Sequence, residues 1–115
     1  MTIQDVKELL DAAVLCGQEH MDLPITSACG ADMMSDVLAF VKEQSVLLTG
    51  LVNPQVIRTA EMMDMHCIVF VRGKEPDRGM LDLAAQCGMA VLHTPLRMYT
   101  ACGRLYAAGL KGEDA

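Results

Sequence analysis

The chain has 115 residues, of which 52% are hydrophobic, and its formal net charge at pH 7 is −6. This length fits one domain with a single modest core, and the acidic balance argues against nucleic acid as a partner, because phosphates bind to basic surfaces. No apolar run approaches the roughly 18 residues of a membrane-spanning helix, and the N-terminus lacks a signal-peptide pattern. We therefore expect a cytoplasmic protein that does not contact a membrane.

The cysteine and methionine content narrows the class of protein further. The five cysteines are scattered without a Cys-x-x-Cys pair, which is typical of a reducing compartment and argues against a disulfide framework. No cysteines or histidines have zinc-ligand spacing, so the sequence predicts no metal site and no cofactor. Ten methionines and no tryptophan indicate an aliphatic, Met-rich core, although the pairs Met33-Met34 and Met62-Met63 leave open an adaptable contact surface.

The first part of the chain predicts two helices and two short strands. Thr2 is placed to cap a helix with apolar residues at helical spacing over 6–13. Residues 14–16 either extend that helix or, in the interpretation we favour, form a brief strand. A second strand over 25–29 follows. Asp32 is placed to cap the second helix, whose apolar face comprises Met34, Val37, Leu38 and Val41.

The stretch 45–73 predicts a complete strand–helix–strand crossover unit. An apolar run over 46–49 ends at a glycine, after which Asn53 is a good N-cap and Pro54 fits the first helical position. A second apolar, β-branched run covers 66–71. Such continuous runs are typical of strands that helices cover on both faces.

The last third predicts two more helices around one strand. Asp77 is placed to cap the first of them, and Gly88 to end it. A strand over 89–93 follows. Thr94 is then placed to cap a long final helix that reaches about Leu110.

Strand–helix units therefore repeat four times, at intervals of about twenty residues. This rhythm predicts an α/β fold: a three-layer sandwich with a mostly parallel sheet of four to five strands and helices on both faces. We expect a single domain over residues 1–115, with a polar tail from about residue 111.

Ligands of parallel sheets bind beyond the carboxyl ends of the strands, where helix N-termini offer free amides. The turns at these ends supply glycines, capping side chains and two cations, Arg72 and Lys74, which suit a small anion or a nucleotide. The residues that we expect to form such a site are Gly30, Asp32, Thr49, Gly50, Asn53, Arg72, Gly73 and Thr94. Ordinary capping and turn geometry explain most of these residue types equally well. Arg72 is the least explained by folding, although it could pair with Glu75 or Asp77. We expect the turns Thr49-Gly50 and Arg72-Gly73 to lie at neighbouring strand ends, which is the first place to look for a ligand.

The final helix carries two apolar stripes, whereas a helix packed on a sheet needs only one. Either the helix is sunk between its neighbours, or it forms a self-association surface in a homodimer. The residues that would form such a surface are Tyr99, Cys102, Gly103 and Tyr106.

Motifs for catalysis are lacking. The sequence contains neither a Gly-x-x-x-x-Gly-Lys-Ser/Thr phosphate loop nor a Gly-x-Ser-x-Gly elbow. Cys29 and His93 both end predicted strands, so a Cys–His pair is conceivable, although such residues are more often structural. We assign no catalytic residue, and a small enzyme using this pair is the least favoured interpretation.

Three segments carry a family resemblance: Thr49-Gly-Leu-Val-Asn-Pro-Gln-Val-Ile-Arg-Thr-Ala-Glu-Met, Ile68-Val-Phe-Val-Arg-Gly-Lys and Ala101-Cys-Gly-Arg-Leu-Tyr-Ala-Ala-Gly-Leu. They resemble the DRTGG-domain family, in particular its small stand-alone bacterial members, over roughly residues 2–110. The literal Asp-Arg-Thr-Gly-Gly string is absent. The resemblance implies a fold similar to the N-terminal domain of HPr kinase/phosphorylase and a regulatory, dimer-forming role. A serine kinase label by kinship is not supported, because the phosphate loop of that kinase belongs to a domain that this chain lacks.

The leading interpretation is thus a non-catalytic regulatory module, a homodimer that binds a small anionic or nucleotide ligand at the strand ends. The alternative is an interaction subunit that docks on a larger metabolic or redox enzyme through a Met-rich, acidic surface.

Overall fold

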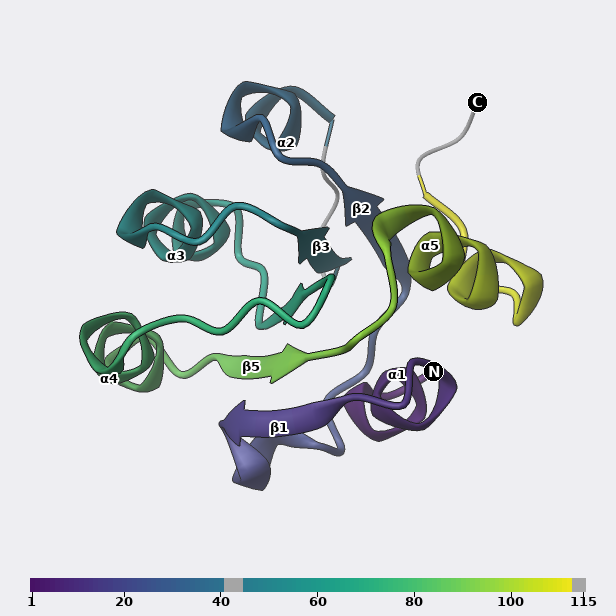
Figure 1. The fold of residues 1–115 in the computed structure, drawn as a ribbon, viewed down its shortest axis with the longest axis horizontal. Helices are drawn as coiled ribbons and strands as arrows, with labels where there is room; N and C mark the ends of the chain where they lie inside the picture. Colours follow the sequence, from purple (N-terminus) through teal and green to yellow (C-terminus); the bar gives the residue numbers. More distant parts are fainter. Residues whose placement is uncertain (41–44, 113–115) are drawn as a thin grey trace.

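A computed structural model describes residues 1–40 and 45–112 of the chain. In this part of the chain, five helices, one 3-10 turn and five strands alternate (Figure 1). In order they are α1 (Ile3–Leu9), β1 (Ala13–Cys16), η1 (Gln18–His20), β2 (Ser27–Gly30), α2 (Met34–Phe40), β3 (Ser45–Thr49), α3 (Pro54–Met62), β4 (Cys67–Phe70), α4 (Arg78–Gln86), β5 (Ala90–His93) and α5 (Met98–Ala107).

The five strands form one sheet in the order β1-β5-β4-β3-β2. Strands β2 to β5 are parallel, and β1 joins the far edge antiparallel to β5. Helices α2, α3 and α4 cover one face of the sheet, and α1 and α5 cover the other (Figure 1). The structure confirms the predicted three-layer α/β sandwich with a mostly parallel sheet.

The central strands explain why the sheet is covered on both sides. Every residue of β3 and β4 is buried, and alternate side chains enter two separate cores. Leu48 and Val69 pack in the core under α1 and α5, whereas Leu47 and Ile68 pack under α3 and α4. Burying an aliphatic side chain of this size contributes about 1.5–3 kcal/mol. These strands therefore contribute to both cores and join the two helical layers.

Local sequence signals set most helix starts. Thr2 and Asp5 form a reciprocal capping box at α1, Asn53 accepts from the backbone of Gln55 at α3, and Asp77 accepts from the backbone of Met80 at α4. These three predicted caps are confirmed. Gly88 follows α4 with φ of +71°, the left-handed conformation expected after a helix end.

Several predicted boundaries were wrong. Strand β2 begins at Ser27, because Pro24 and Ile25 pair with the N-terminal residues instead. On α2 the Leu38 side chain is 44% exposed and does not belong to the apolar face, and Val41 lies outside the described residues. The final helix begins at Met98 and ends at Ala107, which makes it shorter at both ends than predicted.

Candidate functional site

The C-terminal ends of β3 and β4 lie side by side. Thr49 pairs with Phe70 in the parallel register, and the backbone N–H of Val71 donates to the carbonyl of Thr49 at 3.0 Å. The turns that follow the two strands, Thr49-Gly50 and Arg72-Gly73, are therefore neighbours, as the sequence predicts.

Asp32 reaches across to the end of β3. Its Oδ1 accepts from the Thr49 hydroxyl at 3.0 Å and from the backbone N–H of Gly50 at 2.7 Å. The predicted role of Asp32 as the cap of α2 was wrong, since α2 begins at Met34 and the carboxylate bonds to the neighbouring strand. The Gly50 amide, which an anion could have bound, is thus already occupied by a carboxylate of the chain itself.

Arg72 adopts an unusual backbone conformation. Its φ is +60°, and Gly73 follows with φ of +68°. The backbone N–H of Lys74 donates to the carbonyl of Val71 at 3.2 Å, so the four residues form a tight turn with two left-handed central positions. The first of these positions favours asparagine or glycine, because a larger L-residue costs about 1–2 kcal/mol there.

The loop that precedes α5 holds this turn in place. The N–H of Arg72 donates to the carbonyl of Leu96 at 2.7 Å, and the N–H of Gly73 donates to the carbonyl of Thr94 at 2.8 Å. The Arg72 side chain turns toward β3, where a methyl group added at Gly50 would overlap its guanidinium. Gly50 therefore provides the room in which the guanidinium lies.

The guanidinium of Arg72 is exposed, and it makes no hydrogen bond or ion pair with any of residues 1–40 and 45–112. The two pairings that the sequence leaves open are not realised. Glu75 lies 3.7 Å from His93 Nε2, and the carboxylate of Asp77 caps α4. Arg72 is thus a cation whose position is defined by its backbone and whose hydrogen-bond donors remain available.

Three other predicted site residues have structural roles instead. The Asn53 side chain caps α3. Thr94 was predicted to cap α5, and this was wrong. It is buried, and its hydroxyl donates to the carbonyl of Leu10 at 2.6 Å. Gly30 lies beside α5, where an added methyl group would come within 2.7 Å of Cys102 Sγ. Gly30 therefore permits close packing of α5 on β2.

Two further cations lie beside this site, and the sequence analysis missed one of them, Arg97. Lys74 is exposed two residues after Arg72, and the exposed Arg97 follows Leu96, whose carbonyl bonds to Arg72. Arg97 also lies in a strand–helix turn, and that position is the signal that could have identified it.

Cys29 and His93 do not form a pair. Cys29 lies on β2 and His93 on β5, with β3 and β4 between them. At about 4.8 Å per strand the separation is roughly 14 Å, too far for proton transfer. His93 faces Glu75 instead, and its Nδ1 is buried without a hydrogen-bond partner among the described residues.

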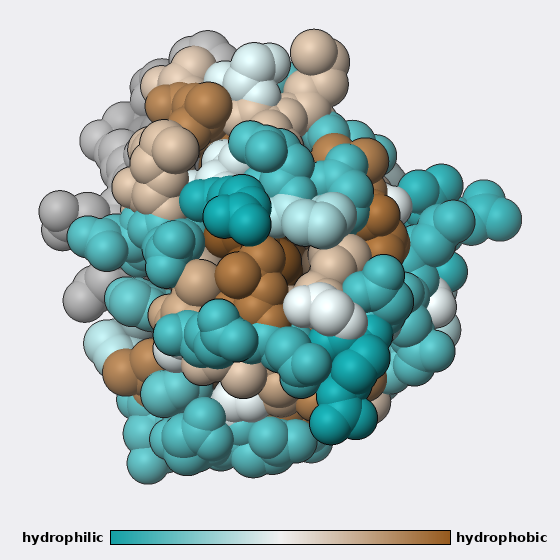
Figure 2. Space-filling model, turned by 90° about the vertical axis from the view of Figure 1, so that its left-hand side faces the viewer, coloured by the Kyte–Doolittle hydropathy of each residue, from teal (hydrophilic) through white to brown (hydrophobic). Residues whose placement is uncertain are grey.

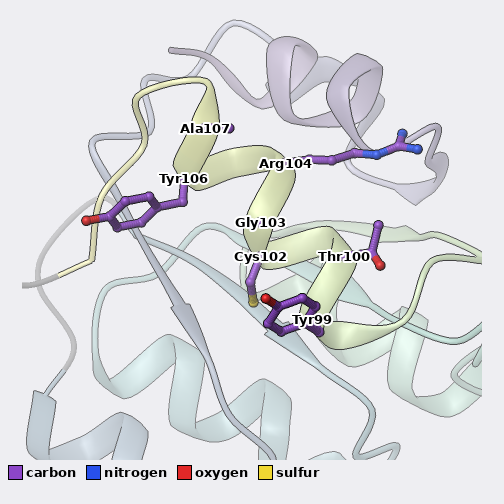
Figure 3. Close-up of a pocket in the computed structure, with 7 residues that line it drawn as sticks. All are labelled: Tyr99, Thr100, Cys102, Gly103, Arg104, Tyr106 and Ala107. Carbon is purple, nitrogen blue, oxygen red and sulfur yellow. The ribbon is translucent and has the colours of Figure 1, made fainter.

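The outer face of α5 is hollowed. An open depression of about 700 Å³ runs along it, and its lining includes the four residues that the sequence singles out, Tyr99, Cys102, Gly103 and Tyr106. Both tyrosines project from the same side of the helix, while Thr100 and Arg104 point to the other side (Figure 3). We call Tyr99, Cys102, Gly103 and Tyr106 the α5 face.

Within residues 1–40 and 45–112, no three His, Cys, Asp or Glu side chains are grouped so that they could hold a metal ion. Over the same part of the chain, no helix has the length and apolar character needed to cross a membrane.

Comparisons with known proteins agree with this architecture. No curated protein matches the sequence. Among solved structures, the chain is similar to one described as the CBS and DRTGG domains of the regulatory region of Clostridium perfringens pyrophosphatase, complexed with the activator diadenosine tetraphosphate. The TM-score is 0.74 at 17% identity over 90% of this chain, which spans 45% of the solved one. The model of the DRTGG domain matches residues 5–108, so the chain belongs to the DRTGG domain family.

Proposed function

We propose that this domain is a non-catalytic regulatory module that binds a small anionic ligand of the nucleotide class at the C-terminal ends of β3 and β4, and that it works as a homodimer. The observation that carries the proposal is Arg72. Its exposed guanidinium has no partner among the described residues, and its backbone adopts a conformation that other residues would adopt at lower cost.

Strain of this kind is kept where the side chain has a use. A type I′ turn needs only asparagine or glycine at the position of Arg72, so the turn itself does not require a guanidinium. A planar guanidinium is suited to a phosphate group, which it can bind through two parallel hydrogen bonds. Lys74 and Arg97 would add to the positive potential around such a group.

Asp32 favours a nucleotide over a simple inorganic anion. Its Oδ1 is engaged by Thr49 and Gly50, and its Oδ2 has no hydrogen bond to a described residue. A carboxylate at this point repels a bare anion but accepts a hydrogen bond from a hydroxyl or amino group. A ligand with phosphate at Arg72 and hydroxyl groups toward Asp32 satisfies both charges.

The pyrophosphatase regulatory region supports the same ligand class. Its structure was determined in complex with diadenosine tetraphosphate, a dinucleotide activator of that protein. This chain resembles part of that region in fold, and we extend the ligand class, not the particular ligand, to it.

Thermal-shift measurements with adenosine and guanosine nucleotides, including dinucleoside polyphosphates, test the proposal. We expect at least one nucleotide to raise the melting temperature, and Arg72→Ala to abolish that rise. Arg58→Ala, which removes an exposed arginine from α3, is the matched control and should keep it. An unchanged rise in Arg72→Ala would contradict the assignment of the site.

A second candidate function has its own support. Met33 and Met62 are 65% and 71% exposed, and the side of the molecule formed by α2, α3 and α4 has an apolar centre ringed by hydrophilic side chains (Figure 2). Exposed thioethers adapt readily to a partner surface. If no nucleotide shifts the melting temperature, docking of this face on a larger enzyme becomes the better account.

A further inference from the structure

The two tyrosines of the chain both lie on the α5 face, and one of them is a projecting knob. The Tyr99 side chain is 91% exposed, although a tyrosine contributes a large apolar area when it is buried. Four residues further along the same helix, Gly103 lies open: apart from its chain neighbours and the backbone of its own helix, no atom lies within 4 Å of the position where its Cβ would be. The α5 face thus carries a projecting side chain, the knob, and one helical turn away a position without a side chain, which we call the hole (both residues are labelled in Figure 3).

The charge of this face favours a second copy of the chain as its partner. Arg104 is the only Asp, Glu, Lys or Arg within α5, and it is paired with Asp11 at 3.1 Å. Beyond the helix, Lys111 Nζ lies 3.6 Å from the centre of the Tyr106 ring and adds a positive charge to this face. Two molecules that each carry a net charge of −6 repel one another over most approaches, and they meet with least repulsion where carboxylates are absent. A face without acidic residues meets that condition.

The open surface also continues beyond α5. The depression shares Cys102 and Tyr106 with a groove of about 300 Å³ that continues past Gly30 to Leu110 and Gly112, at the edge of β2. A standard interface buries about 800 Å² per partner, so the contact extends past these two hollows to the surface around them.

We infer that Tyr99 of one copy fills the space above Gly103 of a second copy, and that the reverse contact forms at the same time around a two-fold axis. This geometry rests on the homodimer proposed above and specifies how its subunits meet. A closed two-fold interface requires one patch to be complementary to itself. A knob and a hole on the same helix face, four residues apart, satisfy this requirement when two α5 helices pack antiparallel.

Exchanging the knob and the hole tests this pairing. Tyr99→Ala removes the knob, and Gly103→Tyr fills the hole. Each single variant should raise the dimer dissociation constant at least about 30-fold, because loss of a central aromatic contact has an effect of this size. Sedimentation velocity measures the dissociation constant. The double variant carries a knob at 103 and a hole at 99, so it should return to within about tenfold of the unsubstituted chain.

The variants are expected to fold, since Tyr99 is exposed and the space at Gly103 is open. Ala85→Tyr, which adds an exposed tyrosine to α4, is the control for a new aromatic surface and should leave the dimer unchanged. A dimer that both single variants leave intact, or a double variant no tighter than the weaker single variant, overturns the pairing but not the homodimer. A chain that is monomeric at 100 µM or more overturns both.

Discussion

Arg72 has a backbone that asparagine would adopt at lower cost and an exposed side chain with open hydrogen-bond donors. If the residue is retained for ligand binding, its replacement should separate stability from function. Arg72→Asn is expected to raise the free energy of unfolding by about 1 kcal/mol, because asparagine favours the left-handed turn position. Urea denaturation measures the change, and Lys74→Asn, at an exposed position with ordinary φ, should alter stability by less than about 0.5 kcal/mol. A clear loss of stability in Arg72→Asn would mean that the guanidinium supports the fold.

Cys67 gives a prediction about pH. Complete burial raises the pKa of its thiol from 9.0 to about 12. Between these values the unfolded chain releases the proton while the folded chain keeps it, so stability falls as pH rises. The loss should be about 1.4 kcal/mol per pH unit above pH 9. Urea unfolding of the unsubstituted chain and of Cys67→Ala at pH 8 and pH 10.5 isolates this contribution; parallel pH profiles would show that the thiol is not buried as described.

At the scale of elements, the link from Asp32 to β3 joins two neighbouring strand ends. Asp32→Ala would leave the buried Thr49 hydroxyl and the Gly50 amide without their acceptor, at a cost of about 1–3 kcal/mol in the free energy of unfolding. Asp32→Asn retains an acceptor at the same place and should cost less. Asp22→Ala, at an exposed loop position, is the control. Equal stability of Asp32→Ala and Asp22→Ala in urea titrations would contradict this role.

The same elements indicate what could be predicted from the sequence. The caps of α1, α3 and α4 were predicted correctly because each joins groups two or three residues apart. Asp32 was assigned wrongly because it bonds to Thr49, 17 residues away, and Thr94 because its hydroxyl donates to Leu10, 84 residues away, and accepts locally only from Leu96, before the helix begins. Capping preferences depend on local spacing and carry no information on such contacts. The proximity of Arg72 to Gly50 was predicted, since parallel strands that follow one another usually pair.

At the scale of the whole molecule, β3 and β4 are buried on both faces, so helices must cover both sides of the sheet. The continuous apolar runs of these strands are the reason that the three layers could be predicted from the sequence. The antiparallel position of β1 was not predicted, because a four-residue strand carries no signal for the edge it joins or for its direction. The hollow along α5 could be suspected from a second apolar stripe, but the lack of atoms around Gly103 required the structure.

The proposed ligand site and the α5 face are connected through the fold. The turn at Arg72 and Gly73 is hydrogen bonded to the loop that leads directly into α5. A ligand that reorders this turn therefore acts on the first residues of the helix proposed to bind a second copy. This connection gives a regulatory module a physical path between binding and assembly.

The most direct test of the central claim is to locate a bound nucleotide by amide chemical shifts, titrating ¹⁵N-labelled protein with the nucleotides that raise its melting temperature. The account predicts that the largest, saturable shifts fall on Gly50, Gly73 and Lys74 and disappear in Arg72→Ala. Saturable shifts confined to α2 and α3, or no shifts at millimolar nucleotide, would contradict it.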